Sequence, residues 1–247
     1  MQTQERPTEV TPPRQPVPRR RMDGDRKCAV VAGVLFITAI AAGVLSKLLL
    51  GLVEQPDYLS TIAGNQSRMA LGALCIIVMS FAGAGIAIAL YPVLRRHGEG
   101  MALGAVSFRT MEAVIFLVAG IVQFSLLALS ERYLTAGPAE AASLGAIGAW
   151  LLEAEVWLFS SAGAIAFALG ALLYYWIFFR SRLIPRWLSV WGLIAIVMNL
   201  AMAVSVLFGL SPDSGTASVL TLPIFLNELV LGVWLIAKGF DRSRVAA

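Results

Sequence analysis

The stretch from residue 69 to residue 93, MALGALCIIVMSFAGAGIAIALYPV, decides the fold, because it holds no charged side chain. A helix needs about 20 apolar residues to cross the hydrocarbon core of a bilayer, and this run supplies them without interruption. A membrane-spanning strand would instead alternate apolar and polar residues, and an open sheet would leave its edge groups unpaired in lipid. We therefore interpret residues 69–93 as a transmembrane helix.

Five further apolar runs of bilayer length accompany this one. The composition agrees with a membrane protein: 58% of the residues are hydrophobic and 14% are charged, with a mean hydropathy of +0.79. Soluble domains carry about 25% charged residues. The sequence predicts an all-α, polytopic bundle of six transmembrane helices, of which the third and fourth are long enough to tilt or to project beyond the lipid. The other five runs cover residues 28–52, 101–129, 150–178, 187–210 and 218–239.

The segments outside the bundle are short. Residues 1–27 are rich in Pro and Arg and have no apolar periodicity, which predicts a disordered cytoplasmic tail. A basic stretch before an apolar run also occurs in signal peptides, but this run is about twice as long as a signal-peptide core, so we expect a retained anchor. The transmembrane domain should then cover residues 28–241, and residues 242–247 should form a cytoplasmic C-terminal tail.

The basic residues predict the orientation of the bundle. With the N-terminus inside, the cytoplasmic segments hold fifteen of the 19 Lys and Arg residues, whereas the three outer loops hold only Arg68 and Arg132. Cytoplasmic loops of membrane proteins carry an excess of Lys and Arg. We therefore expect both termini in the cytoplasm, and a multi-pass protein of the cell membrane, the inner membrane of a bacterium.

Basic clusters also indicate the partners of the protein. The net charge is +4, but the basic residues lie directly beside the apolar runs, which favours the lipid bilayer as the partner and not nucleic acid. Arg19-Arg20-Arg21 and Arg26-Lys27 precede the first run, and such clusters attract anionic lipid headgroups. An oligomer is compatible with the sequence, which does not indicate the number of subunits.

Ionisable residues within the apolar runs form the candidate functional site. A charge near the bilayer centre costs roughly 2.5–3.5 kcal/mol on insertion scales and usually faces the bundle interior. Arg109 and Glu112 lie in the third run, Asn199 in the fifth, and Asn227 and Glu228 in the sixth. At a rise of about 1.5 Å per residue, Arg109 and Glu228 fall at a similar depth. We therefore expect Arg109 to pair with Glu228, with Glu112 as a second partner, and Asn199 to lie nearby.

The third run has a distinct polar face. At about 100° per residue, its polar and small residues fall on one stripe, and a wholly apolar face lies opposite, suited to lipid. The stripe holds Arg109, Glu112, Phe116, Gly120 and Gln123, and the opposite face holds Met111, Val114, Val118, Ile121 and Val122. A buried charge pair that only fixes the helix register and a functional site both fit this pattern.

A second group of charges lies near the outer rim. Lys47 is close to the outer end of the first run, and Glu153 and Glu155 stand at the start of the fourth. Carboxylates in a first helical turn complement the helix dipole, and a lysine can extend to the membrane surface. We interpret these three residues as structural.

No residue set indicates catalysis, a metal or a cofactor. The single histidine, His97, lies in a predicted cytoplasmic turn, and Cys28 and Cys75 lie near opposite membrane faces. These positions exclude a His-based triad or a His/Cys metal site within the membrane. We expect no catalytic residues, no metal ligands and no cofactor.

Several segments together resemble a known family. They are Tyr91-Pro92-Val93-Leu94-Arg95-Arg96, Phe108-Arg109-x-x-Glu112, Leu183-Ile184-Pro185-Arg186-Trp187 continuing to Gly192, and Asn227-Glu228 continuing through Trp234 to Phe240. The chain resembles, over about residues 28–241, the bacterial membrane-protein family catalogued as domain of unknown function 4386. The resemblance implies a six-helix bacterial inner-membrane protein and no particular reaction.

Three functional hypotheses follow. In the first, the polar centre binds or passes a small solute or a proton, the molecule being unknown. In the second, the bundle is a structural or accessory protein whose buried charges fix packing or assembly with a partner. The third, an intramembrane enzyme, is remote because the runs contain no nucleophile with a neighbouring base. A cavity that reaches Glu228 would favour the first hypothesis, and a closed, dry charge pair the second.

Overall fold

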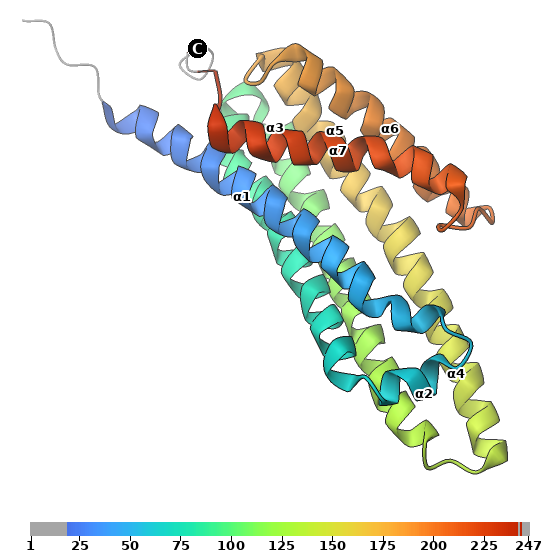
Figure 1. The fold of residues 1–247 in the computed structure, drawn as a ribbon. Coiled ribbons are helices and arrows are strands. Elements are labelled where there is room, and N and C mark those ends of the chain that lie inside the picture. The colour runs from blue at the N-terminus through green and yellow to red at the C-terminus, as the bar shows by residue number, and fades with distance from the viewer. Residues whose placement is uncertain (1–18, 242, 244–247) are drawn as a thin grey trace, which may run out of the picture.

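The computed structural model describes residues 19–241 and residue 243, and the fold is all-α (Figure 1). Among the described residues there is no strand. The elements in chain order are α1 (Arg19–Leu50), the 3₁₀ turn η1 (Gly51–Glu54), α2 (Tyr58–Ala63), α3 (Gln66–Tyr133), α4 (Pro138–Val156), the π-helical segment η2 (Trp157–Gly163), α5 (Ala164–Ser181), α6 (Arg186–Leu207) and α7 (Gly215–Ala237).

The helices confirm a multi-pass membrane protein. Five of the described helical segments are long and apolar enough to cross a bilayer, and the longest, α3, has 68 residues. At Gly98 the backbone of α3 leaves the helical region (φ 164°, ψ 87°) and the chain reverses, so α3 forms two antiparallel arms. The arms pack together where Gly120 faces Ile76 and Ile77. Counting the two arms separately gives the six predicted spans.

The spans form a ring. The α1 helix packs against α3 and α7, α3 against α5, α5 against α6, and α6 against α7 (Figure 1). The main apolar core lies towards the end of the ring where α1 begins and α7 ends, and it includes Phe36, Tyr174, Tyr175 and Phe178. Large apolar side chains such as Val114 and Ile194 face outward, as expected for a lipid-facing surface.

Two glycines bring α1 and α7 into close contact. A Cβ atom on Gly33 would lie 2.6 Å from the Gly232 carbonyl oxygen, and one on Gly232 would lie 3.0 Å from Phe36 Cβ. Small residues let membrane helices approach this closely. Figure 1 shows that the two helices diverge from this crossing toward the other end of the bundle. Their divergence leaves room between them for the cleft described below.

The first helix starts earlier than the sequence predicts. It begins at Arg19, so residues 19–27 are helical, whereas the predicted disordered tail runs to residue 27. Two contacts stabilise this extension: Arg96 forms a bidentate ion pair with Asp25 (2.8 and 3.0 Å), and Arg26 donates hydrogen bonds to the carbonyls of Leu235 and Ile236. A cation at a helix C-terminus complements its dipole. Residues 1–18 of the predicted tail, and residues 242 and 244–247 of the C-terminal tail, lie outside the described residues.

The fourth span also extends further than predicted. It begins at Pro138 and continues as one 44-residue helix to Ser181, including the π-helical segment. Proline fits the first helical position, and the alanine-rich sequence after it favours a helix. At about 1.5 Å per residue this helix is ~66 Å long, against a hydrocarbon core of about 30 Å. The prediction that the fourth span tilts or projects beyond the lipid therefore agrees with its length.

Candidate functional site

The buried face of the second arm of α3, the arm after Gly98, matches the predicted stripe. Arg109, Glu112, Phe116, Gly120 and Gln123 are all buried. On the opposite face, the predicted lipid-facing residues Met111, Val114, Val118 and Ile121 are exposed. The prediction was wrong for Val122, which is buried beside the second apolar cluster of the protein. One helix thus presents its charges to the interior of the ring.

Arg109 contacts its own helical arm, the other arm of α3, and α5. It is 2% exposed, and its Nη1 lies 2.8 Å from Glu112 Oε2, an i,i+3 ion pair. Its Nε donates to the Gly83 carbonyl (3.3 Å) on the other arm of α3, and its guanidinium lies 4.8 Å from the centre of the Phe167 ring on α5. Planar guanidinium groups favour such aromatic faces. The cation is therefore held by three helical segments.

Two glycines provide the space for this side chain. A Cβ atom on Gly170 of α5 would lie 2.9 Å from Arg109 Cγ and 3.3 Å from the Ala105 carbonyl oxygen. A Cβ atom on Gly83 would lie 3.2 Å from Arg109 Nη2. Real Cβ contacts are almost never shorter than about 3.0 Å. Glycine at these positions thus allows a long basic side chain to lie inside a close-packed bundle.

The charges line a cleft of about 320 Å³. Arg109 and Glu112 come from α3, Glu228 from α7 and Lys47 from α1, and the remaining walls are mostly apolar. Most of the apolar lining comes from the α1 residues Ala39, Ile40, Gly43 and Val44, from Met79 and Phe116 on α3, and from Phe167 and Phe225. The cleft therefore lies where α1 and α7 diverge, and it is open rather than enclosed.

Glu228 is not bonded to Arg109 as predicted. Among the described residues, Arg109 forms its ion pair with Glu112 alone, and Glu228 accepts a hydrogen bond from the Tyr174 hydroxyl (3.0 Å). The prediction of a direct Arg109–Glu228 pair was wrong, because the i,i+3 neighbour reaches the guanidinium without crossing the cleft. Both residues still face the same cleft. Glu228 is partly buried and makes no ion pair with a described residue.

Asn227 has a different role from its neighbour. Its side-chain oxygen accepts a hydrogen bond from the Tyr175 hydroxyl, and its amide nitrogen donates to the Leu188 carbonyl (3.2 Å). It is fully buried and joins α5, α6 and α7 behind the cleft. Asn199 is also buried, in α6, but it does not line the cleft, and its side-chain oxygen has no partner among the described residues.

Two tyrosines that the sequence did not indicate belong to the site. Tyr174 and Tyr175 are fully buried, and they orient Glu228 and Asn227 respectively. Tyrosines near the end of an apolar run usually indicate a position at the membrane surface. The available signal was their adjacency within the run, opposite the adjacent polar pair Asn227-Glu228 of the sixth run, since both hydroxyls bond to α7.

A second cavity of about 360 Å³ adjoins the cleft near the end of α1 that the basic residues predict to face outward, and we call it the outer cavity. The two share Gly43, Lys47 and Met79, and the second cavity is also lined by Glu54 and Glu155. Lys47 lies 3.4 Å from Asp213, and both side chains are about three-quarters exposed, at 75% and 73%. The lining of the outer cavity thus contains one cation, Lys47, and two carboxylates, Glu54 and Glu155.

Glu153 and Glu155 do not begin a helix. They lie at the end of α4, well inside the long fourth span, so their predicted role in complementing a helix dipole was wrong. The helix begins earlier because Pro138 and the alanines after it initiate it. Glu153 is exposed, whereas Glu155 is partly buried, lies beside the buried Gln123 and faces the outer cavity. Only Glu155 therefore belongs to the candidate site.

The π-helical segment η2 lies between the two cavities. Its Phe159 stacks on Phe116 of α3, with ring centres 4.3 Å apart and planes inclined by 10°. Phe159 lines the outer cavity and Phe116 the cleft. Single π-turns inside α-helices occur frequently at functional sites. The stacked pair thus joins η2 to α3 beside both cavities.

A family comparison covers most of the bundle. The family model described as Domain of unknown function (DUF4386) matches residues 31–239. The chain belongs to the DUF4386 family. The match includes every residue of the cleft and of the outer cavity.

No curated protein and no solved structure was found to match this DUF4386 chain. The family assignment agrees with the resemblance carried by Phe108-Arg109-x-x-Glu112 and Asn227-Glu228. In the structure, these two segments supply three of the four charged residues that line the cleft, and Lys47 of α1 is the fourth.

Proposed function

We propose that this multi-pass membrane protein binds or passes a small solute or a proton at the cleft between α1, α3, α5 and α7. The observation that supports the proposal is the cleft of about 320 Å³, which joins Arg109, Glu112 and Glu228. Ligand sites combine mostly apolar walls with a few convergent polar groups, and intramembrane charges are rare and usually functional.

Glu228 is the residue on which the proposal depends. It faces the cleft, its only hydrogen bond from a described side chain comes from Tyr174, and its charge is not cancelled by a contacting cation. A carboxylate in this position can bind a cationic group or exchange a proton. We infer that a solute reaches it through the outer cavity, because the outer cavity and the cleft share Gly43, Lys47 and Met79 in their linings. We place this activity in the inner membrane of a bacterium, in keeping with the family resemblance and the basic cytoplasmic segments.

A structural role is the second candidate. The Arg109 and Glu112 side chains are only 3% and 8% exposed, and Gly83 and Gly170 fit closely around the arginine. A pair enclosed in this way can fix the register of α3 without binding anything.

A metabolite comparison separates the two candidates. A strain lacking the protein would be complemented with the wild-type chain, with Glu228→Gln, or with Glu153→Gln, at equal amounts in the membrane. Glu228→Gln keeps an acceptor for the Tyr174 hydroxyl but removes the charge, so the cells should accumulate the same metabolites as the deletion strain. Glu153 is exposed and lines neither cavity, so Glu153→Gln should restore the wild-type profile. Full complementation by Glu228→Gln would contradict the proposal and favour a structural role.

A further inference from the structure

A pocket of about 390 Å³ lies at the end of the bundle where α5, α6 and α7 meet. It is formed by the connection between α5 and α6 and by the end of α7 with the residues after it. The lining residues are Arg182, Leu183, Ile184, Pro185, Arg186, Trp234, Lys238, Gly239, Phe240 and Asp241. None of these lines the cleft or the outer cavity, so this pocket is separate from the proposed solute site.

Backbone geometry fixes both walls of the pocket. Arg182 ends α5 in the left-handed region (φ 59°), and Gly239 turns the chain after α7 (φ +72°). The Asp241 amide then donates to the Leu183 carbonyl (2.8 Å), which joins the two walls. A non-glycine residue in the left-handed region is uncommon, and Arg182 is the one described case in this chain. The basic side chains are therefore presented by a defined backbone.

The pocket carries three basic side chains and one carboxylate. Arg182, Arg186 and Lys238 are exposed and make no ion pair with a described residue. Two other cations at this end of the bundle are engaged in the fold: Arg96 pairs with Asp25, and Arg26 donates hydrogen bonds to carbonyls at the end of α7. The carboxylate of Asp241 accepts hydrogen bonds from the amide and hydroxyl of Ser243. The pocket thus has an excess of positive charge available to an anion.

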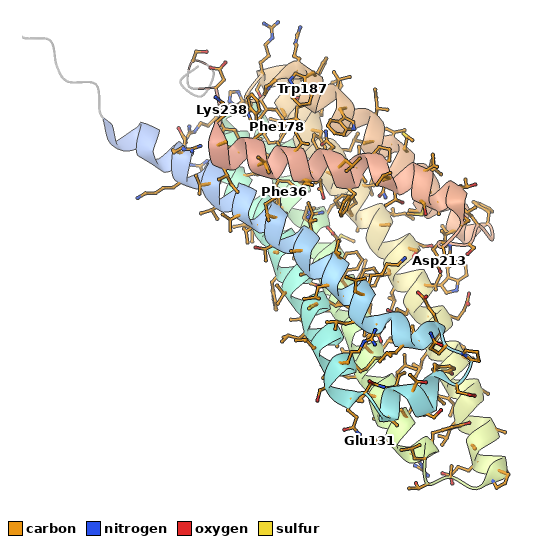
Figure 2. The ribbon with its side chains drawn as sticks, viewed as in Figure 1. Phe36, Glu131, Phe178, Trp187, Asp213 and Lys238 are labelled. Atoms are coloured by element: carbon orange, nitrogen blue, oxygen red, sulfur yellow. The ribbon has the colours of Figure 1, made fainter. Side chains whose placement is uncertain are left out.

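Apolar surface continues from the pocket along the bundle. Its inner wall is made of the buried side chains Leu183, Ile184 and Phe240. Beside it, Trp187, Val190 and Ile194 of α6 and Val233 of α7 are exposed on the lipid-facing surface. Figure 2 shows Trp187 and Lys238 at the same end of the molecule, opposite Asp213 and Glu131. Because one bilayer-length helix, α6, begins here and another, α7, ends here, we expect the pocket to open at the membrane surface.

We propose that this pocket binds the phosphate of an anionic phospholipid headgroup, with the acyl chains lying on the exposed apolar surface of α6 and α7. Arg182 and Lys238 provide the charge, Arg186, held over the Phe179 ring at 5.6 Å, closes the site, and Trp234 packs beside the glycerol. Basic pockets between transmembrane helices recognise lipid headgroups in this way. A free phosphate ion would need only the cations and would make no use of the apolar surface.

Native mass spectrometry of the full chain in detergent tests the proposal. The probes are phosphatidylglycerol and phosphatidylcholine of the same acyl composition, supplied together. The pocket variant is Arg182→Asn with Lys238→Gln, since asparagine tolerates the left-handed conformation. The control variant, Arg95→Gln with Arg180→Gln, removes the same charge from exposed positions outside the pocket. If the double variant proves unstable, the single variant Lys238→Gln replaces it in the same measurement.

The wild-type chain and the control variant should retain phosphatidylglycerol in preference to phosphatidylcholine. In the pocket variant, the ratio of bound phosphatidylglycerol to bound phosphatidylcholine should fall about tenfold. Equal retention by the pocket and control variants would overturn the proposal, because a general surface charge would then explain the binding. Inorganic phosphate added at the lipid concentration should not displace the lipid. If it does, the site binds a soluble anion, and the lipid assignment is wrong.

Discussion

The Arg109–Glu112 ion pair combines a short distance with almost complete burial. Removing one member leaves the other charge inside the bundle without a partner. Such a loss costs roughly 3–5 kcal/mol, more than the pair itself contributes. We therefore expect Glu112→Met to lower the free energy of unfolding strongly, and Arg109→Met with Glu112→Met to recover much of the loss. Reversible unfolding in mixed detergent measures both changes.

A surface pair provides the matched control for this prediction. Arg132 Nε lies 2.9 Å from Glu140 Oε1, but the two side chains are largely exposed. Exposed ion pairs contribute about 0–1 kcal/mol. Glu140→Met should therefore change the stability little. If Glu112→Met lowers the free energy of unfolding no more than Glu140→Met does, the prediction is wrong. Water would then solvate Arg109 in the cleft, and the ion pair would not be enclosed.

Gly170 gives a second prediction at the scale of single residues. Alanine normally stabilises a helix interior relative to glycine by about 1 kcal/mol. At Gly170 the added methyl group would lie 2.9 Å from Arg109 Cγ, and overpacking of this kind typically costs about 1–3 kcal/mol. We expect Gly170→Ala to be destabilising. Gly145→Ala, where nothing lies within 4 Å, should be neutral or stabilising in the same thermal unfolding assay. Equal effects at the two positions would show that Arg109 does not need this space.

The sequence could predict which residues face the interior but not how they pair. Helical periodicity places Arg109 and Glu112 on one buried stripe, because the 100° step fixes relative angles within a single helix. The partner of Glu228 depends on how α5 and α7 pack, and no periodicity within one run specifies this. Tyr174 was missed for this reason. Asn227 was identified as polar and buried, but its bonds to Tyr175 and Leu188 follow only from the packing of three helices.

At the scale of elements, apolar runs indicate spans well and helix ends poorly. The hydropathy of a run marks the part of a helix that lies in lipid. The helix itself continues wherever the next residues favour it and find contacts, as they do at Pro138 and at Asp25. The π-helical segment has no signature in the run from 150 to 178, because one inserted residue leaves the hydropathy unchanged. We nevertheless expect it to set the direction in which Glu155 points.

The π-helical segment therefore offers a prediction of its own. A π-turn is equivalent to one residue inserted in an α-helix, so deleting Ser160 should restore α-helical geometry. The deletion would rotate α4 by about 100° relative to α5 and turn position 155 away from the outer cavity. In a chain with Cys28 and Cys75 replaced, the variant Glu155→Cys should react readily with a charged thiol reagent, and the deletion should slow this reaction markedly. Glu131→Cys, exposed on α3, should react equally in both backgrounds. An unchanged rate at position 155 would show that η2 does not orient this residue.

At the scale of the whole molecule, the ring of helices gives each end of the bundle its own chemistry. One end holds the Gly98 turn, the connection between α5 and α6, and the end of α7, together with Arg26, Arg96 and the basic pocket. The other end holds α2 and the long projections of α3 and α4, and it carries the mouth of the cleft. The even number of spans places the start of α1 and the end of α7 at the same end, as six runs predicted. Which end faces the cytoplasm remains a prediction from the basic residues.

Fusions of alkaline phosphatase test the orientation of the two ends. This enzyme needs an oxidising compartment to form its disulfides, so it is active only on the outer side of the membrane. A fusion after residue 60, in α2, should be active, and a fusion after residue 98, in the turn of α3, should be inactive. A second pair, after residues 136 and 183, should repeat the pattern, because the chain crosses once between them in the helix from Pro138 to Ser181. Activity after residues 98 and 183 alone would reverse the orientation, and the cleft would then open to the cytoplasm. Activity that fails to alternate between successive fusions would mean that one arm of α3 or the long fourth helix does not cross the bilayer.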